Sequence, residues 1–256
     1  MFPADEPPAL VISTDRPSFS NGTGIQPQGH LNFEMGYLYT VRNRDEVNQQ
    51  RNTLPELLVR LGVLEDRLEF RVSTSGYAWI HTDPGPSGRA EDTEGWNDFS
   101  LGMKLKLWDQ DVWLPRVAVL AQCSTGSGSD SVSSEIAEPT AQFLWSYDLS
   151  LCLNDALKGW TLGGNVNAAW PTSNGERFLQ GQFSAYVSFP IAGTLSGFAE
   201  FYALTPNTKG SSAACYVDTG VLFLIDPRVQ LDARIGFGLT DQSDSFYVGV
   251  GLSVLF

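Results

Sequence analysis

The sequence contains no apolar run of the roughly 18–20 residues that a transmembrane helix requires. It also has few basic residues, 16 Lys and Arg against 29 Asp and Glu, which gives a formal net charge of -13. Because binding to nucleic acid requires a basic face for the phosphates, no nucleic-acid partner is expected. The missing apolar run argues against a helical membrane protein. It leaves a transmembrane β-barrel open, because barrel strands alternate polar and apolar residues and average out in hydropathy.

Cysteine and histidine are too sparse for most metal centres and catalytic units. Cys123, Cys152 and Cys215 are widely spaced and odd in number, so a zinc knuckle is excluded and they cannot all pair internally. Small buried or lipid-facing thiols are the simplest interpretation. His30 and His81 fall at opposite ends of the predicted sheet, and neither has a partner serine visible in the sequence. We therefore predict no catalytic residue, no metal site and no cofactor.

Residues 1–26 are predicted to form an irregular arm, because they are rich in proline and Pro27 ends the segment. Polar residues such as Thr14, Asp15 and Arg16 permit a position inside a barrel lumen as a plug. A disordered periplasmic tail is equally compatible with them. The start also lacks the basic and apolar regions of a signal peptide, as the mature form of an exported protein would. The chain is thus divided into an arm, residues 1–26, and a barrel, residues 27–256.

Polar and apolar residues alternate from Leu31 to Val41, a period of two that predicts a β-strand. Ordinary strands have about 5–6 residues, whereas a strand that spans a membrane needs about 9–11. The same alternation recurs often enough to predict about twelve strands, an even number as in single-chain bacterial barrels. The candidate strands centre on residues 31–41, 56–63, 68–73, 98–107, 116–121, 142–147, 162–170, 182–189, 199–201, 217–223, 231–238 and 246–256.

The connections between these strands are predicted to alternate in length, as short periplasmic turns and long external loops do. Residues 149–160 are an exception, because they could extend a strand or form a turn. The short connections fall near residues 64–67, 108–112, 190–194 and 226–228. The longer ones fall near residues 42–52, 80–95, 124–138, 171–177 and 205–213.

An alternating sheet turns its apolar face inward in water and outward in lipid. Twelve long apolar faces would overfill a soluble core, so we predict a closed antiparallel up-and-down barrel in lipid. Tryptophans near the strand ends resemble an interfacial aromatic girdle, although Trp79, Trp96 and Trp108 fall on the polar face by simple counting. The alternative is a soluble or surface-attached β-sandwich that binds a ligand through its loops.

The polar face carries acidic and basic residues in near balance, which could pair across a confined lumen. A ring of such charges at a constriction would set ion preference. The alternative is that the charges only stabilise the interior. The candidate lumen and selectivity residues are Glu34, Glu56, Arg60, Glu69, Arg71, Lys104, Asp232 and Arg234.

Short motifs occur in a fixed order along the chain: TDRPSF at residues 14–19, GHLNFEMGY at 29–37, LPELLVR at 54–60, FAEFY at 198–202, and VQLD and GFGL at 229–232 and 236–239. This order resembles the family of outer-membrane transporters grouped with the phenol-degradation meta-pathway proteins, from about Thr14 to Phe256. The resemblance implies a channel in the bacterial outer membrane that passes small solutes, hydrophobic or aromatic compounds among them. It does not carry over a particular substrate.

The terminal Val-Leu-Phe resembles the aromatic signal read by the barrel-assembly machinery, which makes Phe256 the candidate assembly residue. The other expected partners are outer-membrane lipids, a small-molecule solute and lipopolysaccharide, whose bridging divalent ions acidic loops could bind. A third hypothesis is an outer-membrane lipid hydrolase, for which activity would have to depend on His81.

Overall fold

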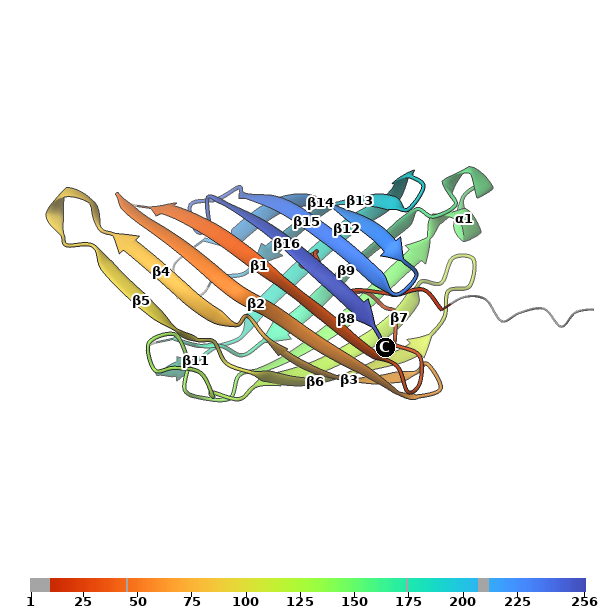
Figure 1. Ribbon diagram of the computed structural model, residues 1–256, viewed down its shortest axis with the longest axis horizontal. Coiled ribbons are helices and arrows are strands. Elements are labelled where there is room, and N and C mark those ends of the chain that lie inside the picture. Colours follow the sequence, from red (N-terminus) through yellow and green to blue (C-terminus); the bar gives the residue numbers. More distant parts are fainter. Residues whose placement is uncertain (1–9, 45, 174, 207–211) are drawn as a thin grey trace, which may run out of the picture.

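The computed structural model describes residues 10–44, 46–173, 175–206 and 212–256. Its main strands join edge to edge in one antiparallel sheet, which closes because β1 pairs with both β2 and β16 (Figure 1). The predicted closed antiparallel barrel is confirmed. Residues 1–9 of the predicted arm and 207–211 of a predicted connection lie outside the described residues.

The strands of the described ranges are β1 (Leu31–Arg44), β2 (Val47–Leu64), β3 (Leu68–Thr74), β4 (Tyr77–Asp83), β5 (Glu91–Trp96), β6 (Ser100–Trp108), β7 (Arg116–Ser124), β8 (Pro139–Asp148), β9 (Thr161–Ala169), β10 (Thr172–Ser173), β11 (Glu176–Arg177), β12 (Gln180–Ala192), β13 (Leu195–Leu204), β14 (Ala214–Asp226), β15 (Val229–Gly238) and β16 (Phe246–Leu255). The helical segments are η1 (Gly85–Ser87), α1 (Leu149–Cys152) and η2 (Asp155–Leu157). Among the described residues, no helix is both long and apolar enough to cross a bilayer.

Two positions in the barrel wall are each occupied by two strands in line. The C-terminal part of β2, residues 57–64, pairs with β3, and its N-terminal part, residues 48–54, pairs with β4. The next position around the wall is occupied by β5 and β6, where β6 pairs with β3 and β5 pairs with β4. With β3–β4 and β5–β6 each taken as one interrupted strand, the described wall has the predicted twelve strands.

Three neighbouring positions of the wall, β2, β3–β4 and β5–β6, exchange their inward-facing and outward-facing residues at one level. β2 is continuous, but its pairing with β1 shifts register at residues 54–55, which include Pro55. Gly76 (φ 77°) separates β3 from β4, and residues 97–99 separate β5 from β6. Proline lacks the N–H that a strand ladder needs, and glycine adopts a positive φ without strain. Each of these irregularities shifts the alternation by one residue, so the following side chains change face.

This reversal corrects the placement of the tryptophans. Trp79 and Trp96 lie on the outer face of the β4–β5 hairpin, where both pack against Tyr77, and not on the polar face. Trp108 follows a register shift after Lys106 and is also exposed. The prediction extended the alternation of the strands at residues 68–73 and 98–107 to these tryptophans. It placed them on the wrong face because a break or a register shift lies between each tryptophan and the strand used for counting.

Several predicted loops are shorter in the structure than in the prediction. β1 and β2 continue through most of residues 42–52, and β4 and β5 cover much of residues 80–95. The β4–β5 hairpin extends past the other strands at the end opposite the C-terminus (Figure 1). The ambiguous residues 149–160 contain α1 and η2 instead of a strand. The side chain of Asp148 caps α1 by accepting a hydrogen bond from the N–H of Ser150.

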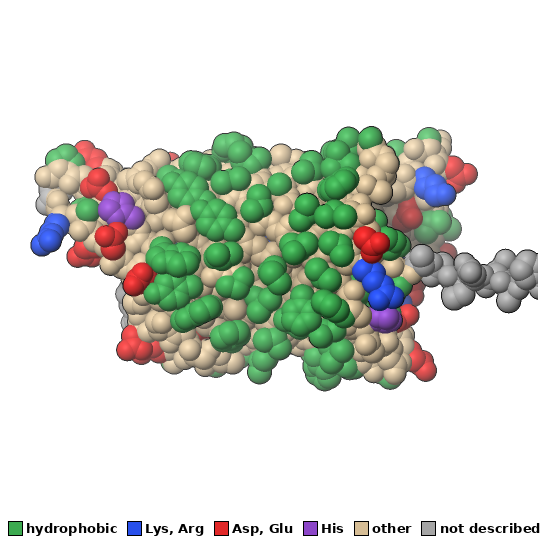
Figure 2. Space-filling model, viewed as in Figure 1, with side chains coloured by type: hydrophobic (Ala, Val, Ile, Leu, Met, Phe, Trp, Pro, Cys, Tyr) green, Lys and Arg blue, Asp and Glu red, His purple; other side chains and the backbone are tan. Residues whose placement is uncertain are grey.

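The outer surface of the wall is a belt of apolar side chains, and the charged side chains in the same view gather toward the two ends (Figure 2). This arrangement suits a bilayer core between two polar interfaces, so the barrel spans a membrane of the bacterial outer-membrane type. Exposed residues of the belt include Met35, Leu61, Phe70, Val72, Leu101, Met103, Phe143, Val166, Phe183, Phe201, Val217, Phe223, Leu231, Ile235, Val248 and Val250.

Candidate functional site: a plugged lumen

Charged side chains of the strands point into the lumen. Arg60, Glu69 and Lys104 are fully buried, whereas Leu61 and Met103, their neighbours on the same strands, are exposed. Buried charges and exposed apolar residues are the reverse of a soluble domain, which excludes the β-sandwich alternative. All the predicted lumen residues lie on this inner surface: Glu34, Glu56, Arg60, Glu69, Arg71, Lys104, Asp232 and Arg234.

Residues 12–28, here called the arm loop, fill the lumen between these charges. The N–H of Ile12 donates to the carbonyl oxygen of Pro227 at 2.8 Å, and Gln28 bridges to Gly62. Both contacts lie at the end of the barrel where the C-terminus is found, so the loop enters and leaves there (Figure 1). An irregular segment inside a barrel needs partners for its backbone N–H groups, and the lumen wall supplies them.

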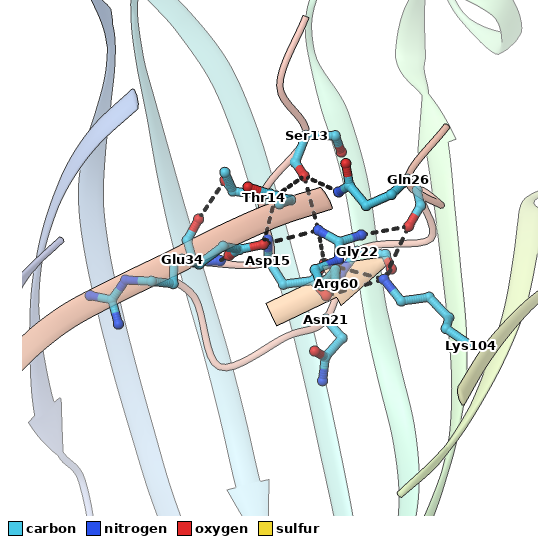
Figure 3. A network of polar contacts seen from close by, with 12 residues as sticks. Ser13, Thr14, Asp15, Asn21, Gly22, Gln26, Glu34, Arg60 and Lys104 are labelled. Atoms are coloured by element: carbon cyan, nitrogen blue, oxygen red, sulfur yellow. Dashed lines mark hydrogen bonds and ion pairs between the residues drawn. The ribbon is translucent and has the colours of Figure 1, made fainter. Parts of the chain in front are cut away.

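Asp15 is the centre of a charged cluster, which we define as Asp15, Arg60, Glu69, Arg71 and Lys104. Figure 3 shows Asp15, Arg60 and Lys104 of this cluster. Its carboxylate lies 2.9 Å from Arg71 Nη1 and 3.1 Å from Lys104 Nζ. Arg60 and Lys104 both pair with Glu69, at 3.0 and 3.3 Å. Burial alone would raise the pKa of Asp15, but the positive charges of Arg60, Lys104 and Arg71 hold it well below its usual range.

The wall also binds the arm backbone in this region. Lys104 donates to the carbonyl oxygens of Gly22 and Gly24 at 2.9 and 3.0 Å. Glu34 Oε2 accepts hydrogen bonds from the N–H of Asp15 at 2.9 Å and from the N–H of Arg16 at 2.8 Å. These charge-assisted bonds fix the course of the loop as well as its position.

Arg16 ties the arm loop to the opposite edge of the same charged surface. Its guanidinium lies 2.8 Å from Glu56 and 3.3 Å from Asp232. A Cβ at Gly36 or Gly251 would lie 2.2 or 2.5 Å from Arg16 nitrogens, so both glycines make room for this side chain. Arg234 adds a second cation beside Glu56 at 3.2 Å.

On the other side of the lumen the arm loop is held mainly by uncharged groups. Ser20 Oγ lies 2.6 Å from Ser184 Oγ, and Thr23 Oγ1 lies 2.6 Å from Ser146 Oγ. The N–H of Asn21 donates to Asn165 Oδ1 at 2.7 Å. The carboxylate of Glu200 accepts the N–H groups of Phe19 and Ser20 at 2.7 and 2.9 Å.

Aromatic rings complete the contact with the arm. Phe19 stacks on Tyr202 with ring centroids 4.2 Å apart, and Tyr202 stacks on Tyr216 at 4.6 Å. Tyr247 closes the group, since its hydroxyl accepts from Tyr202 and donates to Asp218. We call Phe19, Tyr202, Tyr216 and Tyr247 the aromatic cluster.

Two polar cavities remain in the lumen beside the arm loop. One of about 370 Å³ is lined by Arg16, Phe19 and Arg234 among others. The other, of about 380 Å³, lies toward the long-loop end and is lined by residues such as Arg42 and Asp244. Glu56 lines both cavities, so it faces the space on the outer side of the plug.

Sequence reasoning found the lumen charges but missed the aromatic cluster. The signal was present in the strand phase, because Tyr202 alternates with the exposed Phe201, and Tyr216 with the exposed Val217. A tyrosine on the polar face of a barrel strand points into the lumen. The two histidines lie apart: His30 Nδ1 is 3.0 Å from the carbonyl oxygen of Phe256, and His81 pairs with Asp92 on the β4–β5 hairpin.

Solved structures that share this fold include outer-membrane barrels. The β-domain of the Bordetella autotransporter BrkA matches with a TM-score of 0.57 at 11% identity, over 90% of this chain and 100% of that one. The transport unit of the Escherichia coli autotransporter AIDA-I matches with a TM-score of 0.54 at 13% identity, over 90% of each chain. The KdgM porin matches with a TM-score of 0.50 at 8% identity, over 86% of this chain and 98% of that one. At such identities the likeness shows the fold alone.

The chain matches no curated protein sequence. A family model described as "Putative MetA-pathway of phenol degradation" matches residues 14–256, nearly the whole chain. The family resemblance expected from the motifs is thereby confirmed, and the chain belongs to this family.

Proposed function

We propose that this protein is an outer-membrane channel for small solutes, closed in the present state by its arm loop, and that it is not an enzyme. The carrying observation is the ring of contacts around the loop. Its residues bind side chains of β1, β2, β3, β6, β8, β9, β12, β13 and β15. Because these strands surround the lumen, the loop occupies its cross-section.

Hydrophobic or aromatic solutes are the class that we propose for this channel. The family description refers to phenol degradation, and the aromatic cluster places ring faces in an otherwise polar lumen. Ring faces favour aromatic molecules over aliphatic ones of equal size through stacking.

The eight lumen residues divide into two proposed roles. Arg60, Glu69 and Lys104 are fully buried under the arm loop and act as anchors for it. Glu56 keeps 17% of its side chain exposed and lines both cavities, so it is the strongest candidate for setting ion preference.

The proposed partners follow from the outer surface and the ends. Lipid covers the apolar belt, and the acids of the β4–β5 hairpin, such as Glu91 and Asp92, are exposed where lipopolysaccharide cations would lie. Phe256 is exposed and packs edge-on against Phe33 at 5.7 Å, in phase with the lipid face, which suits recognition by the barrel-assembly machinery. His81 lies on the exposed hairpin, away from the lumen, which supports a non-catalytic role.

The test is single-channel conductance of the refolded full chain in a planar bilayer, compared with a variant that lacks residues 1–26. We expect long closed periods for the full chain and a stable open level for the deletion variant. In the deletion variant, Glu56→Lys should shift the reversal potential toward anion preference, whereas Glu176→Lys on the exposed β10–β11 hairpin should leave it unchanged. Equal conductance with and without the arm, in protein that inserts, would refute the plug.

A further inference from the structure

Phe19 is the aromatic residue of the arm loop, and it lies at the end of a stack of three rings. Its ring is nearly parallel to that of Tyr202, with an interplanar angle of 5°, and the Tyr202 and Tyr216 rings meet at 12°. Stacked rings are worth more than the apolar area that they bury. This stack links the arm loop to the barrel wall.

The wall part of this stack is held independently of Phe19. Tyr202, Tyr216 and Tyr247 come from β13, β14 and β16, and each is buried. The hydroxyl of Tyr202 donates to that of Tyr247 at 3.1 Å, which in turn donates to Asp218 at 2.9 Å. Withdrawal of Phe19 would therefore leave a preformed ring-binding surface.

Two further features make this surface suitable for a solute. Phe19 also lines the cavity of about 370 Å³, so a solute in that cavity reaches the stack directly. The carboxylate of Glu200 accepts the N–H of Phe19 at 2.7 Å, beside the stacked ring. If Phe19 leaves, this acceptor becomes available to a hydroxyl group on a solute.

We propose that Phe19 occupies a binding site for a planar aromatic ring, and that a hydroxylated aromatic solute displaces it and lifts the tip of the arm loop from the wall. This inference rests on the proposed channel function and names the solute that opens the plug. The solute stacks on Tyr202 and donates its hydroxyl hydrogen to Glu200, in place of the ring and the N–H of Phe19. A ligand can shift the loop only by the difference between its affinities for the two states, and here it binds only when Phe19 is out.

The experiment follows the exposure of Ser20, which is 2% exposed and next to Phe19. Cys123, Cys152 and Cys215 are free thiols, so each is replaced by serine and Ser20→Cys is introduced into the full chain. The rate at which a small maleimide labels the thiol of Ser20→Cys is measured with phenol and with cyclohexanol. We expect phenol to raise the rate several-fold and cyclohexanol, of similar size and with the same hydroxyl, to leave it unchanged. Equal effects of the two compounds, or no effect of phenol, would overturn the proposal.

Two variants make the result specific. Tyr202→Leu should abolish the response to phenol. Phe19→Leu, which leaves the wall intact, should raise the basal labelling rate about fivefold, as loss of one ring stack predicts, and lower the phenol concentration for half-maximal response. An unchanged rate and unchanged phenol response in Phe19→Leu would refute the competition.

The outcome is separable from that of the channel proposal. If the variant lacking residues 1–26 conducts but phenol does not affect labelling, only the aromatic displacement fails. If that variant inserts and does not conduct, the channel itself is refuted whatever the labelling shows.

Discussion

The two sides of the lumen hold the arm loop by different chemistry. On the side formed by β1, β2, β3 and β6, Asp15 is surrounded by Arg60, Arg71 and Lys104. On the side formed by β8, β9, β12 and β13, most contacts are neutral hydrogen bonds, such as that of Ser20 with Ser184, and one stacked ring pair. Loss of one partner from a buried ion cluster leaves an uncompensated charge, whereas a neutral hydrogen bond contributes only about 0.5–1.5 kcal/mol. The charged side therefore anchors the loop, and the neutral side is where it can detach.

The largest expected effect comes from removing the central cation. Arg60→Met leaves Glu34 and Glu69 without their shared guanidinium, so we expect a loss of about 3–5 kcal/mol in the free energy of unfolding. Urea unfolding of the refolded barrel measures it. The matched control is Arg116→Met, because Arg116 pairs with Asp109 at the surface, where an ion pair contributes at most about 1 kcal/mol. Equal losses in the two variants would contradict the anchoring role.

Acid provides a second way to weaken the charged side. Since the cations around Asp15 lower its pKa in the folded protein, its contribution is complete above its ordinary pKa of about 3.9 and is lost as the pH falls through the lower folded value. The rise in open probability that depends on Asp15 should therefore appear only below about pH 4 in planar bilayers. Asp15→Asn should open more often already at neutral pH and respond less to acid. An acid response below about pH 4 that is equally large in Asp15→Asn and in the unmodified protein would contradict this assignment.

The smallest effect is expected on the neutral side. Ser184→Ala removes the hydroxyl that bonds Ser20 and should destabilise the closed loop by about 1 kcal/mol, which is roughly a fivefold rise in open probability. Ser253→Ala is the control, because Ser253 is equally buried and its hydroxyl has no hydrogen-bond partner in the described part of the chain. A rise in Ser184→Ala as large as that in Asp15→Asn would remove the distinction between the two sides.

The barrel and its lumen charges could be predicted because they depend on neighbouring residues. Alternation such as that of Leu61 with Arg60 is a local pattern, and it determined which side chains face inward. The predicted arm had the right polarity for a lumen position, but its course could not be derived. Asp15 meets Lys104 across 89 residues and Ser20 meets Glu200 across 180, and no local pattern encodes such pairings.

The aromatic cluster and the face reversal lie between these cases. Tyr202 and Tyr216 stood at inward positions that could have been read from phase. Pro55 and Gly76 signalled irregularities, but only the pairing of β2 with both β3 and β4 shows that they lie at one level. The tryptophan error arose from counting through them.

The face reversal has a consequence for how this wall tolerates change. In β2 the outward residues have odd numbers on the C-terminal side of residues 54–55, as Leu61 has, and even numbers toward the N-terminus, as Leu54 has. The next wall position shows the same change, because Val72 of β3 and Trp79 of β4 both face outward. In a saturation survey of substitutions, sensitivity to an introduced charge would follow odd positions along one half of β2 and even positions along the other. The residue at which this pattern changes from odd to even positions would locate the register shift within the continuous strand β2.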